Sequence, residues 1–312
     1  MHSRSWYIGI VIFSAFIVAV ESVSVEGALN IVLLDVFIVT GIPSIIGGLI
    51  LTVVQRDSTI EFTRRLRKKE WAFLVALSTA AAFGAYFWFD AVGEIGAGKE
   101  AILGGGSSEV LFVVILSAIF LSERLSKWEA FGGVLVLVGV FLVLVRADSF
   151  SLSVGKGEME AILSSFLLAS SAVMTAKLLR TYEVAPVSAL ELIISGIIIL
   201  AIGFALGTSL NIDVIGWLIL MALGVFPAIG ILTYFHGLQG IGASITSILF
   251  ALNGIMTLVV QLAIVIVFPD SLMVPQNLLL AFIGGIIAFI GVYLLNKKAP
   301  DKQAYHVPQK VI

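Results

Sequence analysis

The stretch YFWFDAVGEIGAGKEAIL, residues 86–103, occurs a second time in altered form as LTYFHGLQGIGASITSIL, residues 232–249. At a constant offset, aromatic residues coincide and an Ile-Gly-Ala triplet recurs, which pairs Trp88 with Tyr234 and residues 95–97 with 241–243. A second match in the same order aligns FGGVLVLVGVFLVL (131–144) with FIGGIIAFIGVYLL (282–295). Two matches in the same order at nearly equal offsets predict an internal repeat of about half the chain.

The composition places the chain in the membrane class. Of its 312 residues, 60% are hydrophobic and only 12% are charged, whereas soluble domains are near half apolar and a quarter charged. The apolar runs are long and continuous rather than alternating, which excludes a β-barrel. The chain has no cysteine and only three scattered histidines. We therefore expect no disulfide, no metal site and no cofactor.

Spanning helices of about 20 apolar residues are the expected elements. Charged, Pro and Gly-rich punctuation divides the chain into ten of them, at residues 6–25, 30–55, 71–92, 95–121, 128–146, 158–180, 187–207, 213–236, 241–267 and 275–296. The fold class predicted is an all-α integral membrane protein. The third and fourth spans, like the eighth and ninth, leave little room for a turn between them.

Lys and Arg residues set the orientation, because cytoplasmic loops carry them in excess. With the N-terminus inside, only Lys99, Arg146 and Lys156 among 18 basic residues lie outside. Both termini are therefore predicted to be cytoplasmic. Because five is an odd number, the two five-helix repeats, 1–148 and 149–298, are predicted to have inverted topology, followed by a cytoplasmic tail at 299–312. The basic run RRLRKKE at 64–70 is interpreted as a topology anchor, with an anionic-lipid or nucleic-acid patch as the alternative.

The stretch from residue 104 to residue 144 resembles the end of an EamA-type repeat of the drug/metabolite transporter superfamily. That repeat reads Glu-Pro, an apolar run, Gly-Glu-Arg-Leu and a Gly-rich helix; here Glu109-Val110, the segment 122–125 (SERL) and three glycines take these places, namely Gly132, Gly133 and Gly139. In the second half Asn253 stands near the Glu-Pro position and Phe268-Pro269-Asp270 replaces the Glu-Arg loop. The resemblance implies a ten-helix transporter of a small solute. It also implies a cavity among helices 1, 3, 4, 6, 8 and 9, with helices 5 and 10 outside.

The fourth predicted span carries three charges in GAGKEAILGGGSSEVLF, residues 96–112. Ionisable groups at membrane depth are costly and commonly functional. Lys99 is predicted to bind an anionic group of the substrate. Glu109, about nine residues deeper, is predicted to orient the substrate or carry a coupling proton. Glu100 belongs to the coupling or gating set, and on an unbroken helix it points away from Glu109.

The glycine triplet between these charges, Gly104 to Gly106, admits two interpretations. Three glycines weaken a helix, so Ser107 and Ser108 could cap a restarted half-helix whose amides face an anion. Alternatively, the glycines permit close packing against a neighbouring helix. Further candidates are the cavity residues Asn253, Trp88 and Tyr234 and the gate residues Asp35 and Glu191, which are paired with each other as acids early in the second helix of each half.

These observations predict a secondary transporter of the plasma (inner) membrane rather than an enzyme, moving a small polar metabolite by alternating access. An amino acid or related carboxylate-bearing solute is favoured because of Lys99. A lipophilic-cation or multidrug exporter and a nucleotide-sugar or phosphorylated-sugar exchanger are alternatives, and a membrane scaffold is the alternative without transport. The expected partners are the small-molecule substrate, the lipid bilayer and protons as coupling ion, and no nucleic acid.

Overall fold

The described residues fold entirely into helices. The computed structural model describes residues 3–120, 127–144, 154–269, 271–274 and 278–295. The helices are α1 (Arg4–Asn30), α2 (Val36–Val54), α3 (Arg56–Arg65), α4 (Lys68–Ile95), α5 (Ala97–Leu103), the π-helix η1 (Gly104–Ser108), α6 (Glu109–Phe120), α7 (Lys127–Leu144), α8 (Lys156–Leu178), α9 (Val184–Ala205), α10 (Val214–Leu223), α11 (Val225–Ile241), α12 (Ala243–Phe250), α13 (Leu252–Val267) and α14 (Leu278–Leu295).

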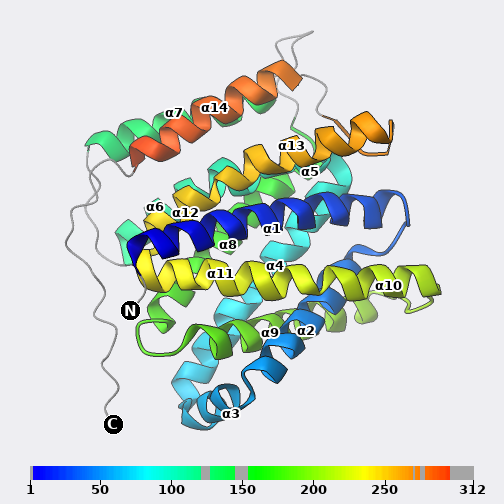
Figure 1. Ribbon diagram of the computed structural model, residues 1–312, viewed down its shortest axis with the longest axis vertical. Coiled ribbons are helices and arrows are strands. Elements are labelled where there is room, and N and C mark those ends of the chain that lie inside the picture. The colour runs from blue at the N-terminus through cyan, green and yellow to red at the C-terminus, as the bar shows by residue number, and fades with distance from the viewer. Residues whose placement is uncertain (1–2, 121–126, 145–153, 270, 275–277, 296–312) are drawn as a thin grey trace.

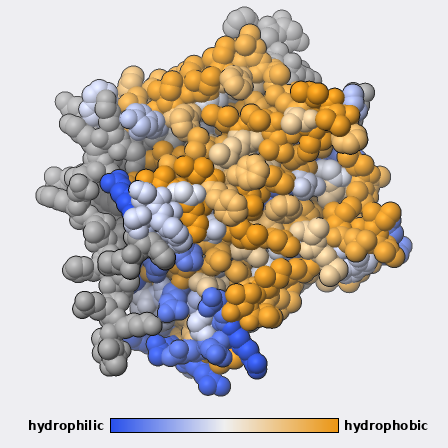
Figure 2. All heavy atoms as spheres, viewed as in Figure 1, coloured by the Kyte–Doolittle hydropathy of each residue, from blue (hydrophilic) through white to orange (hydrophobic). Residues whose placement is uncertain are grey.

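Eight segments of the described chain are long and apolar enough to cross a membrane. They are α1, α2, α4, α5 to α6, α8, α9, α10 to α11 and α12 to α13, and each overlaps a predicted span. α7 and α14 coincide with the fifth and tenth predicted spans and contain shorter apolar stretches, Phe131–Leu142 and Leu278–Gly291. The face in Figure 2 is broadly apolar, and hydrophilic residues gather near α3. The chain is therefore a multi-pass membrane protein.

Two glycines make the short turns that the sequence left little room for. α4 ends at Ile95 and α5 begins at Ala97, so Gly96 alone joins them, with φ 81°. Gly242 likewise joins α11 to α12 alone, with φ 84°. With ψ of 151° and 164°, both residues lie in a backbone region that is essentially restricted to glycine and costs other residues about 1–3 kcal/mol. The repeat alignment pairs Gly96 with Gly242, so the two halves use the same single-glycine turn at equivalent positions.

The helix contacts follow a two-fold pattern. α2 packs on α9, α7 packs on α14, and the α5–α6 segment packs on α12 and α13. The pair α1 with α11 is matched by the pair α8 with α4. If each helix is exchanged for its equivalent in the other repeat, this set of contacts is unchanged. Figure 1 shows α7 and α14 side by side at one edge of the bundle.

Equivalent glycines support the contact between α7 and α14. A Cβ added at Gly139 would lie 2.5 Å from the Gly284 carbonyl oxygen, and one at Gly291 would lie 2.6 Å from the Gly132 carbonyl oxygen. Each glycine thus lets its helix approach the backbone of the other helix closely. Small residues at helix interfaces serve this purpose in membranes. The reciprocity is what a two-fold relation between the repeats requires.

The triplet region does not form a capped half-helix. Residues Gly104–Ser108 form a π-helix that keeps the chain helical, and the Glu109 amide donates to the Gly104 carbonyl. The Ser107 hydroxyl donates to backbone carbonyls, including that of Leu103 at 3.2 Å, and makes no cap. The amides are therefore not free for an anion. A Cβ at Gly106 would lie 3.3 Å from Gly254 Cα, which shows close packing of the two broken helices.

The segment between α2 and α4 contains a short helix, α3, where the sequence predicted only a loop. Its last turn carries Arg64 and Arg65, both exposed, beside the hydrophilic region of Figure 2. This places the basic run on the surface. The motif at 122–125 and the predicted tail at 299–312 lie outside the described residues.

Candidate substrate-binding cavity

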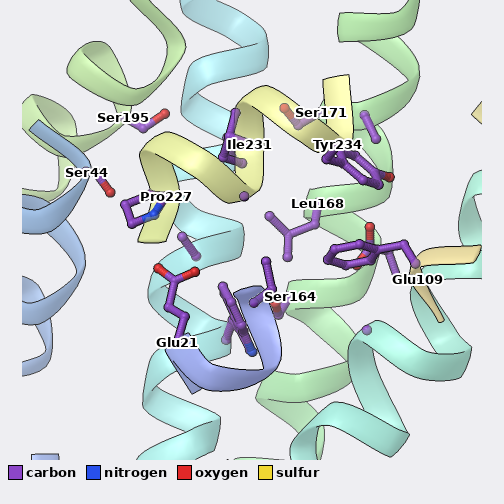
Figure 3. Close-up of a pocket in the computed structure, with 18 of the residues that line it drawn as sticks. Glu21, Ser44, Glu109, Ser164, Leu168, Ser171, Ser195, Pro227, Ile231 and Tyr234 are labelled. Carbon is purple, nitrogen blue, oxygen red and sulfur yellow. The ribbon is translucent and has the colours of Figure 1, made fainter. Parts of the chain in front are cut away.

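A cavity of about 140 Å³ lies between the two halves of the bundle. Side chains from α1, α4, α5, α6, α8, α11, α12 and α13 line it, and the backbone of η1 contributes Gly105. These are the helices that the family resemblance implied. α2 and α9 also reach the cavity, through Ser44 and through Glu191 with Leu192 and Ser195. Figure 3 shows the lining residues converging from both repeats.

Four carboxyl groups face this space. They belong to Glu21 of α1, Glu100 of α5, Glu109 of α6 and Glu191 of α9, and each residue is buried, with at most 6% of its surface exposed. Among the described residues that line the cavity, none is Lys, Arg or His. No ion pair within the described chain involves any of the four. The Glu191 Oε2 atom is buried without any hydrogen-bond partner in that part of the chain. The cavity therefore carries unbalanced acidic groups.

Four of the five serines that line the cavity present acceptors rather than donors. Ser164 Oγ donates to the Gly84 carbonyl at 2.8 Å, and Ser195 Oγ donates to the Ser78 carbonyl at 3.0 Å. Ser44 and Ser165 likewise donate to backbone carbonyls of their own helices, one turn earlier. Because each hydroxyl proton is engaged, only oxygen lone pairs remain for a ligand. Serine and carboxyl oxygens together make an acceptor-rich lining.

Aromatic and amide groups complete the side near Glu100. Trp88 Nε1 donates to Glu100 Oε2 at 2.8 Å. Tyr234 Oη lies 3.3 Å from Ser247 Oγ, and Asn253 Oδ1 accepts from Thr257 at 2.9 Å. The three sequence-predicted residues of this group, Trp88, Tyr234 and Asn253, all line the cavity.

The π-helix explains why Glu100 and Glu109 share the cavity. Nine residues of regular α-helix separate two side chains by about 180°, at about 100° per residue. A π-helical turn accommodates an extra residue and so changes the phase of the following helix by about 100°. The expectation that Glu100 points away from Glu109 is therefore wrong, because it assumed an unbroken helix. Both carboxyls line the cavity.

Lys99 does not belong to the cavity lining. Its ammonium forms an ion pair with Glu158 Oε1 of α8 at 2.5 Å, and Glu158 Oε2 also accepts from the Gly155 amide at 2.8 Å. The Lys99 and Glu158 side chains are 18% and 5% exposed. Nearby, Lys156 contacts Asp90 and Glu94. These ion pairs connect helices of the two halves at the end of the bundle that holds Gly96.

Comparison with known proteins gives the chain its family. The model of the EamA-like transporter family matches residues 5–145 and again residues 155–297. The chain belongs to the EamA-like transporter family. A crystal structure of a protein with 17% sequence identity superposes with a TM-score of 0.68, over 96% of this chain and 100% of that one, which shows a shared fold. No curated protein matches the sequence.

Membership of the EamA-like family, in two repeats, indicates a transporter of small solutes. The two predicted gate residues occupy different places in this transporter. Asp35 is the N-cap of α2, where its carboxylate accepts from the Phe37 amide at 2.8 Å. Glu183 holds the corresponding N-cap position of α9, so the proposed pairing of Asp35 with Glu191 is wrong. Glu191 lies two turns inside α9 and lines the cavity.

Two acidic residues of this EamA-like transporter were not foreseen. The first span was predicted to end at residue 25, whereas α1 continues to Asn30 and carries Glu21 and Glu26 inside it. Glu26 is fully buried and accepts hydrogen bonds from the Ala97 amide at 2.9 Å, the Met273 amide at 2.5 Å and Gln261 Nε2 at 2.8 Å. The acidic residues within the apolar N-terminal run were the available signal.

Proposed function

We propose that this protein is a secondary transporter that moves a small solute carrying a protonated amine or guanidine group. The observation that supports this substrate class is the acceptor-rich cavity, with four buried carboxyls, engaged serine protons and no cationic side chain among the described lining residues. An ammonium group carries donors only and pairs with carboxylates. A cationic solute thus supplies what this lining lacks.

The cavity volume favours a small solute. A cavity of about 150 Å³ in another protein holds benzene, and this one measures about 140 Å³. Nucleotide sugars and bulky lipophilic cations are several times larger. One alternative raised from the sequence was an exporter of lipophilic cations. We keep its proposal that the substrate is a cation, but not that the substrate is large.

The earlier preference for a carboxylate-bearing solute loses its support. That preference rested on Lys99, whose ammonium is paired with Glu158 outside the cavity. Trp88 Nε1, a donor that could meet a substrate carboxylate, is engaged by Glu100. A carboxylate in this cavity would meet no cationic side chain among the described lining residues.

Proton exchange is the proposed coupling. A buried carboxyl without a cationic partner is most stable when it holds a proton, whereas an ammonium beside it stabilises the ionised form. Binding of the solute therefore displaces a proton from Glu109 or its neighbours. If the cavity opens to one side of the membrane with a proton bound and to the other side with the solute bound, solute movement is coupled to a pH gradient.

For the transport cycle we propose ten spans in two inverted five-helix halves, 1–148 and 149–298, with both termini cytoplasmic in the plasma membrane. The two halves rock about the cavity. The matched contacts between the halves, α1 with α11 and α4 with α8, are the ones that change between the two states of the cycle. In this orientation the Gly96 end is the outer one. Opening there requires the Lys99–Glu158 ion pair between the halves to separate.

The test is uptake of methylguanidinium into proteoliposomes under an imposed pH gradient. This probe stays charged at all accessible pH values and is small and rich in donors. We expect gradient-driven uptake by the wild type and its loss in Glu109→Gln. The control is Glu61→Gln, because Glu61 is exposed on α3 and far from the cavity lining. Uptake that is equal in Glu109→Gln and the wild type would overturn the coupling, and no uptake by folded wild type would overturn the substrate class.

A further inference from the structure

The cavity carboxyls lie on two opposite sides. Glu100 and Glu109, on helical segments joined by the π-helix η1, both line the cavity. Glu21 projects from α1 on the other side, and Figure 3 shows Ser164 and Leu168 between Glu21 and Glu109. We call Glu100 with Glu109 the first pole and Glu21 the second pole. Each pole lines the same cavity.

The fourth carboxyl of the cavity, that of Glu191, indicates that the lining is incomplete without a ligand. Glu191 is 4% exposed, lines the cavity, and has one oxygen, Oε2, with no hydrogen-bond partner in the described chain. A buried polar atom without a partner costs about 1–3 kcal/mol. A donor-bearing ligand removes that cost, so the acidic lining is suited to a bound donor.

A single cation satisfies only part of this lining. An ammonium at the first pole leaves Glu21 buried without a counter-charge, and one at Glu21 leaves Glu100 and Glu109 in the same position. Two cationic groups on one solute neutralise both poles at once. Leu168 and Ile231, which line the middle of the cavity, match an apolar link between those groups.

We propose that the preferred solute is a short diamine, with two protonated amines joined by about four methylene groups. One ammonium binds Glu100 and Glu109, and the other binds Glu21. The cavity volume of about 140 Å³ is close to one that holds benzene, which has as many non-hydrogen atoms as a diamine with four methylene groups. This assignment rests on the proposed function, because it presumes that the cavity is the transport site for cations.

The test compares two probes of equal length by calorimetric binding to the purified protein in detergent, where membrane permeation plays no part. The probes are 1,4-diaminobutane and 4-amino-1-butanol, in which a hydroxyl replaces the second amine. We expect the wild type and the control Glu61→Gln to bind the diamine at least about tenfold more tightly than the amino alcohol. Glu21→Gln should weaken diamine binding by about tenfold and change amino-alcohol binding by less than about twofold.

The outcomes distinguish failure of the diamine assignment from failure of the proposed cation transport. If the wild type binds both probes within about twofold of each other, the diamine assignment is overturned while the cation transporter stands. If folded wild type binds neither probe, the proposed function fails with it. Should Glu21→Gln not fold, Glu21→Asp provides a second measurement. Its carboxyl is one methylene shorter, so the preferred chain should lengthen from 1,4-diaminobutane to 1,5-diaminopentane, and an unchanged preference would overturn the role of Glu21.

Discussion

Two buried glutamates on α1, five positions apart, are expected to respond oppositely to the same substitution. Glu26 accepts three hydrogen bonds, from the Ala97 amide, the Met273 amide and Gln261. Glu21 lines the cavity and takes part in no ion pair among the described residues. We therefore predict that Glu26→Gln destabilises the fold, whereas Glu21→Gln impairs binding and leaves the fold intact.

The magnitude for Glu26→Gln follows from its partners. Glutamine keeps one acceptor oxygen, which can serve Ala97 and Gln261, but its amide group then faces the Met273 amide. The substitution loses one charge-assisted hydrogen bond, worth about 1.5–3 kcal/mol, and leaves a buried donor unsatisfied at a further cost of about 1–3 kcal/mol. The total is about 2.5–6 kcal/mol. With an unfolding entropy of about 2.1 cal/mol/K per residue, this lowers the unfolding temperature by about 4–9 °C for a chain of this length.

The assay is thermal unfolding of the purified protein in detergent, followed by tryptophan fluorescence, for the wild type and the two variants. Glu21→Gln is the matched control, since it makes the same chemical change at a buried position of the same helix. Its unfolding temperature should stay within about 2 °C of the wild type, because no hydrogen-bonded partner is left behind. Equal falls for the two variants would refute the division into a structural and a ligand-binding glutamate.

Two further predictions concern the end of the bundle that holds Gly96. Lys99→Met should lower the unfolding temperature, because it leaves the Glu158 carboxylate unpaired. The affinity for methylguanidinium should stay within about twofold of the wild type. Loss of affinity without loss of stability would instead show that Lys99 belongs to the binding site. Gly96→Ala should be more destabilising than Gly207→Ala in the same unfolding assay. Both place a side chain at a positive φ, which costs about 1–3 kcal/mol, but an added Cβ at Gly96 would also crowd the Met273 carbonyl oxygen and lie 3.1 Å from Met273 Cβ, whereas one at Gly207 would meet nothing within 4 Å. Equal losses would show that the backbone strain alone decides.

The positions of the helices could be predicted from the sequence because they depend on local properties. An apolar run long enough to cross a membrane is visible without knowledge of its neighbours. The sequence also indicated that the turns before the fourth and ninth spans are short, although Gly96 and Gly242, which form them, lie inside those predicted spans. Trp88, Tyr234 and Asn253 reach the cavity on helices whose role the repeat and the family pattern indicated.

The side-chain partners could not be predicted in the same way. Whether Lys99 faces a substrate or a protein carboxylate depends on Glu158, which lies in the other repeat and is brought beside it by tertiary packing. The relation between Glu100 and Glu109 depends on a π-helix whose phase shift cannot be inferred from helical periodicity. Glu26 was missed because the first predicted span ends at residue 25, one position before it, whereas Glu21 lies inside that span and was not considered as a site residue.

The glycines that shape the helices recur in both repeats, whereas the acidic residues of the fourth span do not, and this difference bears on the proposed cycle. Gly96 and Gly242 repeat, as do Gly139 and Gly291, whereas the residues aligned with Glu100 and Glu109 in the second half are Thr246 and Ile255. A symmetric scaffold by itself gives its two alternating states equal free energy. Any preference must then come from residues that the repeats do not share. Glu26 acts at one end alone, since its three hydrogen bonds join α1, the Gly96 turn and the segment after α13. In the proposed cycle, the unpaired cavity carboxyls therefore set what is bound, and Glu26 favours the state in which these three hydrogen bonds are formed.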